Sequence, residues 1–162
     1  MTSSRNRVCS NTEANSRTRA LTLVLDTNVV LDLVVFRDRG VQPIAEAIAS
    51  GAAIPVTSHA CLEEFGRVLA YPQLALDASA QSDAFEYFRS RAQLFDVPVP
   101  AVAADLPLCS DADDQKFLEL AWHANAHCLV TKDKALLGLG CAVARLGRFA
   151  IVKPETWLQV AS

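Results

Sequence analysis

The sequence feature that most constrains the fold is an apolar run that ends abruptly in three polar residues. Residues 21–31 read LTLVLDTNVVL, so Asp26, Thr27 and Asn28 interrupt two apolar stretches. A continuous apolar run of this length is typical of a strand that is buried on both faces, as in a parallel sheet. Open α/β sheets bind their ligands outside the carboxyl ends of such strands. The polar residues therefore either begin a ligand site or only cap the following helix, and this stretch alone favours neither interpretation.

The rest of the chain alternates short apolar segments with segments of helical character. Further strands are expected at 52–56, 128–131 and 149–152, with a candidate edge strand at 97–100. Helices are expected at 29–36, 43–50, 57–69, 77–95, 109–124, 134–138 and from residue 154 onward. Strands that alternate with helices favour an α/β fold, in which helices cover both faces of a parallel sheet.

The composition fits one globular domain without a membrane span. The chain has 162 residues, of which 51% are apolar, and 15 basic against 18 acidic side chains give a net charge of −3. That charge does not indicate a nucleic-acid-binding protein, but a metal-dependent nuclease concentrates acids in its own site. Residues 1–20 are polar and are expected to be a disordered tail ahead of a single domain at 21–160. No apolar run is long enough to span a bilayer.

The cysteines argue against a zinc site and for a reducing compartment. There are five cysteines, an odd number, and they are widely spaced without a C-x-x-C pair. The three histidines show no ligand spacing, so a structural zinc site is not expected. Free thiols fit the cytoplasm, which is the expected location of this chain.

Four acidic positions far apart in the sequence are expected to meet at one edge of the sheet. They are Asp26 and Asp133 after predicted strands, and the pairs Glu63 with Glu64 and Asp113 with Asp114 near the starts of predicted helices. The carboxyl ends of parallel strands share an edge with the helices that follow, and carboxylates that converge there repel one another. Hard divalent cations such as Mg²⁺ or Mn²⁺ relieve that repulsion. Such a site suits phosphodiester hydrolysis by a metal-activated water.

Helical geometry selects one of the two adjacent glutamates. At about 100° per residue, one apolar face of the helix at 57–69 is formed by Cys61, Leu62, Phe65, Val68 and Leu69. Glu63 points away from that face and should be solvated, whereas Glu64 lies on its flank and can reach the site. The same geometry does not separate Asp113 from Asp114. Asp111 is expected to cap its helix or to support the site.

Four motifs in this order resemble the PIN-domain family, and in particular the group described as toxin components of toxin–antitoxin pairs. The motifs are VLDTNV at 24–29, EEFxxVL at 63–69, SDADDQKFLELA at 110–121 and LVTKD at 129–133, and the resemblance covers about residues 21–158. It implies a three-layer α/β/α sandwich with a central, mainly parallel sheet of four to five strands. It also implies an endoribonuclease that uses Mg²⁺ or Mn²⁺ to cut single-stranded RNA, a homodimer, and a separate antitoxin protein as partner.

The resemblance assigns site residues position by position. The catalytic and metal-binding acids would be Asp26, Glu64, Asp114 and Asp133, and the supporting residues would be Thr27, Asn28, Asp111, Asp113 and Thr131. The form D-D-x-K-F selects Asp114 over Asp113 for the third acid. The long polar segment ahead of the first strand departs from the family pattern, because family members commonly begin close to that strand.

Other α/β proteins fit the sequence less well. A phosphatase of the haloacid-dehalogenase class needs a second Asp two residues after its nucleophile, and Asn28 stands there. A phosphorelay receiver needs an Asp at the end of a middle strand, where this chain has Thr57 and Ser58. A nucleotide-binding fold needs a Gly-rich turn after the first strand, and none is present. A catalytically silent PIN-like module that binds RNA or protein remains the main alternative, although all four acids are retained.

Overall fold

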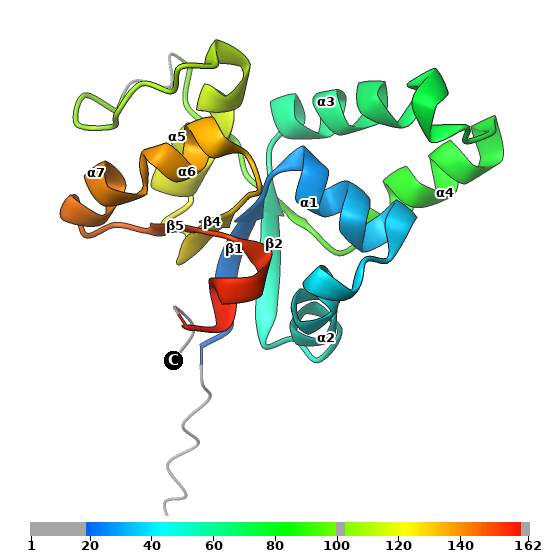
Figure 1. Ribbon diagram of the computed structural model, residues 1–162, viewed down its shortest axis with the longest axis horizontal. Helices are drawn as coiled ribbons and strands as arrows, with labels where there is room; N and C mark the ends of the chain where they lie inside the picture. Colours follow the sequence, from blue (N-terminus) through cyan, green and yellow to red (C-terminus); the bar gives the residue numbers. More distant parts are fainter. Residues whose placement is uncertain (1–18, 100–102, 160–162) are drawn as a thin grey trace, which may run out of the picture.

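The computed structural model describes residues 19–99 and 103–159 and contains a five-stranded parallel sheet (Figure 1). The strands are β1 (Leu21–Leu25), β2 (Ala53–Thr57), β3 (Gln93–Leu94), β4 (Cys128–Val130) and β5 (Ala150–Val152). Their order across the sheet is β3-β2-β1-β4-β5, and every neighbouring pair is parallel. The predicted parallel sheet is confirmed, and the apolar run that opens the domain is its central strand.

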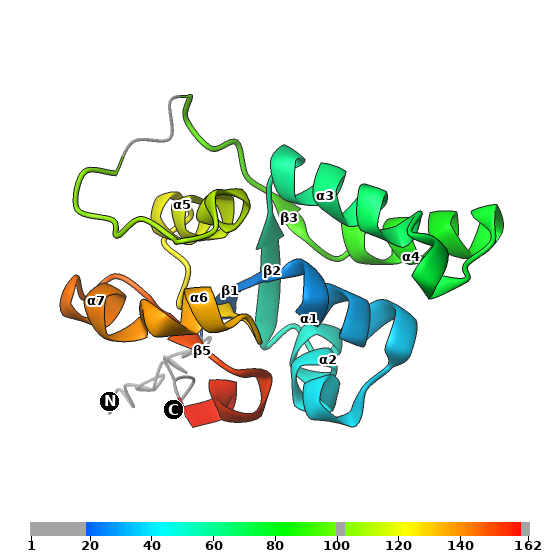
Figure 2. The same cartoon turned by 45° about the horizontal axis from the view of Figure 1, so that its top comes forward.

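Helices cover both faces of this sheet. The α-helices are α1 (Thr27–Leu31), α2 (Gln42–Ala49), α3 (His59–Leu69), α4 (Ala78–Arg89), α5 (Gln115–His123), α6 (Lys134–Gly138) and α7 (Gly140–Arg145). Shorter helical turns are η1 (Asp32–Phe36), η2 (Arg39–Val41), η3 (Pro72–Leu74), η4 (Ala112–Asp114) and η5 (Pro154–Gln159), of which η1 is a π-helix and the others are 3₁₀. Figure 2 shows α5, α6 and α7 grouped apart from α1 to α4.

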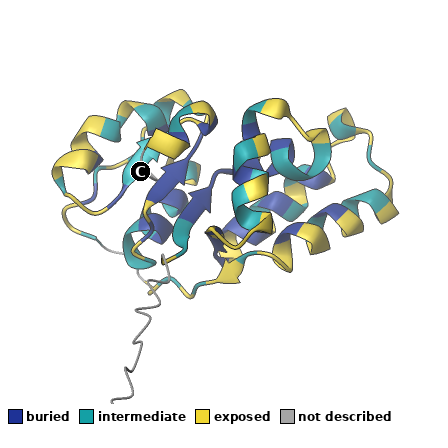
Figure 3. Cartoon of the chain, turned by 90° about the horizontal axis from the view of Figure 1, so that it is seen from below, coloured by how far each residue is buried: buried dark blue, intermediate teal, exposed yellow. Residues whose placement is uncertain are grey.

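The two faces of the sheet carry separate apolar cores. Successive side chains of a strand point to opposite faces, so Leu23 and Leu25 of β1 join one core while Val24 joins the other. The first core includes residues of α1 to α4, and the second includes residues of α5, α6 and α7. In Figure 3 the centre of the sheet is dark blue, because Leu23, Val24 and Leu25 of β1 and all three residues of β4 are buried. This is the expected α/β/α sandwich.

Two sequence expectations in the segment at 77–100 are wrong. Helix α4 ends at Arg89 rather than near residue 95, because the chain turns after Ser90 to pair Gln93 and Leu94 with β2. Phe95 consequently packs in the core opposite to that of Phe88. The edge strand in this segment is therefore β3. Residues 97–99 form no strand, since Pro98 has no N–H to donate to a neighbouring strand, and residue 100 lies outside the described residues.

Helix α1 continues directly into the π-helix η1. The backbone N–H of Arg37 donates to the carbonyl of Asp32, five residues earlier, and Arg37 then adopts a left-handed conformation with φ of 49°. A left-handed non-glycine residue is uncommon, and here it ends the helix and turns the chain towards η2. The predicted helix at 29–36 is thus present; it begins as an α-helix and ends as a π-helix, which has more residues per turn.

No helix in the described part of the chain is long and apolar enough to cross a membrane. Within the same residues Cys61, Cys109, Cys128 and Cys141 are free thiols. The predicted tail at 1–20 lies almost wholly outside the described residues, and Arg19 and Ala20 belong to no strand or helix.

Candidate functional site

The four acids that the sequence predicts as site residues line one cleft. Its volume is about 430 Å³, and its polar lining consists mainly of Asp26, Thr27, Asn28, Glu64, Asp114 and Asp133. Asp26 follows β1 directly and Asp133 stands three residues beyond β4, so both mark the carboxyl edge of the sheet. Glu64 comes from α3 and Asp114 from η4. Four segments that are distant in the sequence thus meet where parallel α/β sheets place their ligands.

Asp26 is the most deeply buried of these acids, with 4% of its surface exposed. It is the N-cap of α1, and its Oδ1 accepts a hydrogen bond from the backbone N–H of Asn28 at 3.3 Å. Its Oδ2 accepts the hydroxyl of Thr131 at 2.6 Å. Burial raises the pKa of Asp26, the two hydrogen bonds lower it in part, and the nearby Asp133 and Glu64 raise it further. The side chain of Asp26 therefore both caps α1 and lines the cleft.

The turn after β4 ties Asp133 to Asp26. Thr131 is fully buried, and while its hydroxyl donates to Asp26 it accepts the backbone N–H of Asp133 at 2.9 Å. Asp133 is the N-cap of α6, where its Oδ1 accepts the N–H groups of Ala135 and Leu136 at 2.7 and 3.1 Å. Thr131, which the sequence places only in a supporting set, thus fixes the relative position of two of the four acids.

Glu64 is held by contacts from two other segments. Its Oε1 accepts the hydroxyl of Thr27 at 2.5 Å, and its Oε2 forms an ion pair with Lys116. Glu63 is exposed on another side of α3, where it lines a separate hollow with Phe85. The helix phase expected from the sequence agrees with this arrangement, while the catalytic role of Glu64 remains a prediction.

Of the three aspartates around η4, only Asp114 lines the cleft. Burial raises its pKa to about 6, and the charges of Asp26, Asp111 and Asp133 act in the same direction. Asp111 and Asp113 are exposed, and Asp111 caps η4 by accepting the N–H of Asp113 at 2.9 Å. The expectation that Asp111 is a cap is thus confirmed.

Lys116 places a positive charge among these acids. Its Nζ pairs with Glu64, donates to the carbonyl oxygen of Asp113, and lies 5.0 Å from the centre of the Phe117 ring. Only 20% of its side chain is exposed. The sequence shows a lysine beside the acids, but it contains no signal for the pairing with Glu64, because that contact forms only when α3 and α5 pack together.

The chemistry of the donor set fits a divalent cation. Four carboxylates supply hard oxygen ligands. Burial first, and neighbouring carboxylates in addition, raise the pKa values of Asp26 and Asp114, so the cleft disfavours negative charge that no cation balances. Across residues 19–99 and 103–159, no three His, Cys, Asp or Glu side chains are already gathered as a ready metal site. Glu64 is held by Thr27 and Lys116, so a cation that binds Glu64 would compete with the ammonium group of Lys116.

A second hollow, which is lined by two lysines and two aspartates, adjoins the acidic cleft. Its volume is about 380 Å³; it contains Lys132 and Lys134 and shares Asn28, Phe36 and Asp133 with the cleft. Lys132 forms an ion pair with Asp32, a buried residue at the start of η1. Negative and positive surfaces are therefore continuous along this edge of the molecule.

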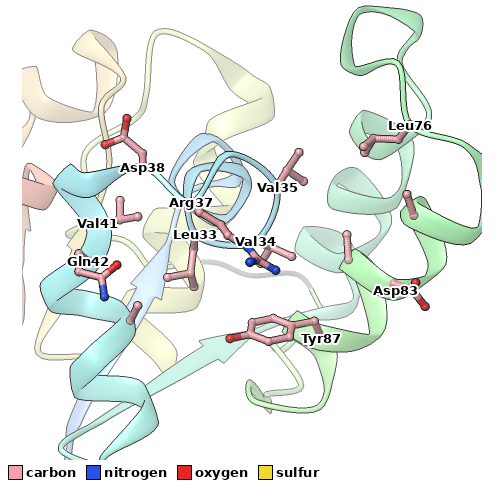
Figure 4. A pocket seen from close by; sticks show the side chains of 13 residues that line it. Leu33, Val34, Val35, Arg37, Asp38, Val41, Gln42, Leu76, Asp83 and Tyr87 are labelled. Carbon is pink, nitrogen blue, oxygen red and sulfur yellow. The ribbon is translucent and has the colours of Figure 1, made fainter.

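A larger hollow of about 720 Å³ lies between η1, α2 and α4 (Figure 4). Leu33, Val34 and Val35 of η1 line one side, and Asp83 and Tyr87 of α4 line the other. None of the four acids lines this groove. It is therefore a surface separate from the acidic cleft.

Comparison with known proteins identifies the fold and a family pattern. The pattern named PIN domain matches residues 22–135. No curated protein sequence matches. Among solved structures, a chain of VapBC2 from Rickettsia felis, determined bound to a DNA fragment from their promoter, superposes with a TM-score of 0.60 at 15% identity. The match covers 82% of this chain and 98% of that one, which establishes a shared fold.

Proposed function

The chain belongs to the PIN-domain family, and from that membership we propose that it is a divalent-metal-dependent endoribonuclease that cuts single-stranded RNA. The observation that carries the proposal is the convergence of Asp26, Glu64, Asp114 and Asp133 on one cleft at the carboxyl edge of the sheet. Carboxylates so placed suit Mg²⁺ or Mn²⁺. Phosphodiester hydrolysis is the chemistry that such ions promote most directly.

In this proposal the four acids would hold a divalent cation, which would supply an activated water and stabilise charge on the phosphate oxygens. Asp26 is the principal ligand because it is the most deeply buried and is oriented at both oxygens. Thr131 holds it through one hydrogen bond and positions the Asp133 backbone through another. Thr27 orients Glu64 in the same way. Asn28, at the exposed mouth of the cleft, is placed to contact the substrate.

We further propose that the chain is the toxin of a toxin–antitoxin pair, acts in the cytoplasm as a homodimer, and is inhibited by a separate small protein. The shared fold with a chain of VapBC2 supports an antitoxin partner. The expected result in light scattering is a dimer of the purified chain. A monomer at every concentration would contradict the dimer without affecting the nuclease proposal.

A catalytically silent binding module is the competing candidate. It is favoured by one observation, the absence of a ready group of three metal ligands among the described residues. The two candidates differ in a simple respect, since only the nuclease leaves shortened RNA.

The test is a cleavage assay on unstructured and structured RNA with Mg²⁺, with Mn²⁺ and with EDTA. Wild-type protein should cut the unstructured RNA only when a divalent ion is present. Asp26→Asn keeps the shape of the side chain but removes its charge, so cleavage should fall by orders of magnitude while the protein stays folded. Asp83→Asn, an exposed acid in the separate groove, is the matched control and should cut normally. Undiminished cleavage by folded Asp26→Asn would contradict the assignment of the cleft as the active site.

A further inference from the structure

Two exposed aromatic side chains line the acidic cleft, and the proposed chemistry does not use them. Phe36 and Tyr71 both line it, and 57% and 52% of their respective surfaces are exposed. Among the described Phe, Tyr and Trp residues only Tyr87 is comparably exposed, at 46%, and it lines the separate groove. Two of three exposed rings therefore share one cleft with the four acids.

Both rings come from residues at or just after the ends of two neighbouring helical segments. Helices α1 and α3 run side by side away from the sheet edge in Figures 1 and 2. Phe36 is the last residue of η1, which extends α1 and ends where Arg37 turns left-handed. Tyr71 follows the end of α3 and precedes Pro72, which begins η3. At 1.5 Å per residue, α3 rises roughly 7.5 Å from Glu64 to its last residue, Leu69, and Tyr71 follows two residues later.

The surroundings of the rings favour a nucleic acid as their ligand. The acids of the cleft suit a cation that binds phosphate. The adjoining hollow also contains Phe36, and in it Lys132 is paired with Asp32, whereas the exposed Lys134 can contact a phosphate. Exposed aromatic rings along such a path are typical of proteins that bind single strands, because every base offers a flat face for stacking.

We propose that Phe36 and Tyr71 stack against an unpaired base of the RNA, next to the phosphate that is cut. This inference rests on the proposed function and names the feature of the substrate that the cleft recognises. In a duplex both faces of each base are covered by its neighbours, so the rings have nothing to stack on. The two rings thus select single strands over duplexes without reading their sequence.

The binding test uses a short single-stranded RNA that contains the fluorescent base 2-aminopurine. It is carried out in the Asp26→Asn background with Mn²⁺, so that the RNA stays intact. Stacking on an aromatic ring should quench the fluorescence. Phe36→Ala and Tyr71→Ala should each abolish most of the quenching and weaken binding roughly 5- to 100-fold. Phe36→Tyr and Tyr71→Phe retain a ring and should keep the fluorescence quenching and the RNA affinity of the parent protein. Tyr87→Ala should change neither the quenching nor the affinity.

A parallel cleavage experiment separates this inference from the proposed function. With Asp26 intact, Phe36→Ala and Tyr71→Ala should raise KM for single-stranded RNA while kcat changes little. If wild-type protein cuts RNA but these variants bind, quench and cut as it does, the base-stacking inference is wrong and the nuclease remains. If wild-type protein cuts no RNA, the proposed function fails, and quenching that depends on the rings would still establish base binding. Variants that bind RNA normally but no longer self-associate would assign the rings to a protein contact and overturn the inference.

Discussion

At the scale of single residues, hydrogen bonds from separate segments decide how the acids are arranged. Thr131 donates to Asp26 and accepts from Asp133, while Thr27 donates to Glu64. Two threonines thus orient the carboxylates of Asp26 and Glu64, and one of them also positions the backbone of Asp133. Residues of this kind control geometry without being ligands, and their loss commonly weakens metal binding.

The adjacent glutamates of α3 provide a first residue-scale prediction. Glu64→Gln should lower kcat/KM for RNA cleavage by roughly 10- to 100-fold or more, because it removes one charge from the cleft. Glu63→Gln is the matched control and should retain nearly full activity, since Glu63 is exposed outside the cleft. Steady-state cleavage rates of the two purified variants check this. If Glu63→Gln lost more activity than Glu64→Gln, the assignment of the catalytic role to Glu64 would be wrong.

Lys116 leads to a prediction about metal affinity. Because its ammonium group pairs with Glu64 in the absence of metal, a cation that recruits Glu64 must displace it. Lys116→Met should therefore tighten Mn²⁺ binding, by roughly two- to fivefold, the equivalent of up to about 1 kcal/mol. Calorimetric titration at pH 8 is appropriate, since Asp114, with its pKa of about 6, is then ionised.

The control for Lys116 is Lys132→Met, because Lys132 pairs with Asp32 rather than with one of the four acids. Loss of a nearby positive charge alone would tighten Mn²⁺ binding equally in both variants, and salt would screen the effect. Equal affinities for the two variants would therefore contradict direct competition between Lys116 and the metal.

Asp114 makes the stability of the metal-free protein depend on pH. Its pKa is raised from 3.8 to about 6 in the folded state, so between these values the folded protein binds more protons than the unfolded chain. The resulting stabilisation is fully present below about pH 4 and is lost as pH rises through 6. Asp26, whose pKa is also raised by burial, acts in the same direction.

The measurement is urea unfolding of wild type and Asp114→Asn in EDTA at several pH values between 4 and 7. Asparagine does not titrate, so the stability of Asp114→Asn relative to wild type should increase as pH rises through this window. A relative stability that is constant with pH would show that Asp114 ionises in the folded protein as easily as in the unfolded chain.

At the scale of elements, α3 both supplies Glu64 and closes the first core. Phe65 is 1% exposed and packs on the rings of Phe85 and Phe88 of α4, at centroid distances of 6.1 and 5.6 Å. The residue after Glu64 is therefore anchored in the core, and this anchoring fixes the direction in which Glu64 points. The position of the acid depends on the packing of two helices as much as on its place in the sequence.

Gly66, inside α3, allows a prediction about helix stability. A Cβ at this position would meet the Phe85 ring at 3.6 Å, an ordinary contact, so alanine fits. Gly66→Ala should stabilise the protein by about 0.5–1 kcal/mol, because alanine loses less backbone entropy in a helix. Activity should not change, since Gly66 lies outside the cleft. Gly51→Ala is the contrast and should destabilise the protein, because Gly51 has φ of +75°, a left-handed conformation that a residue with a Cβ adopts at a cost. Thermal melting of both variants tests the pair.

At the scale of the whole molecule, metal binding should be coupled to folding. The folded chain brings four acids together, whereas the unfolded chain keeps them apart, so a cation that binds only the folded state stabilises it. At a hundredfold excess over Kd the gain is about 2.7 kcal/mol, which corresponds to a rise in Tm of roughly 5–10 °C for a domain of this size. Melting curves with and without Mn²⁺ measure this shift.

Asp26→Asn is the informative variant in that experiment. It should reduce the Mn²⁺-dependent rise in Tm, and it should raise the Tm of the metal-free protein because one repelling charge is gone. The four acids would not form a metal site if wild type showed no Mn²⁺-dependent shift and metal-free Asp26→Asn were less stable than wild type.

The local sequence determined four of the five strands and the residues that begin several of the helices. The apolar runs that became β1, β2, β4 and β5 were recognisable because burial on both faces requires uninterrupted apolar residues. Asp26, Ser58, Asp77 and Asp133 are N-caps, and each is a short polar residue directly before a helical pattern. The common edge of the acids followed from the parallel sheet, since its strand ends and helix starts face the same way.

Tertiary structure alone decided where helices stop and which side chains meet. Helix α4 ends at Arg89 because pairing of Gln93 and Leu94 with β2 satisfies backbone groups that a longer helix would have used, and local helical spacing contains no information about that partner. The ion pair of Lys116 with Glu64, the bond from Thr131 to Asp26, and the shared cleft of Phe36 and Tyr71 join residues far apart in the chain. Such contacts depend on how helices and strands pack, so sequence periodicity indicates the face on which a residue lies but not the partner it finds there.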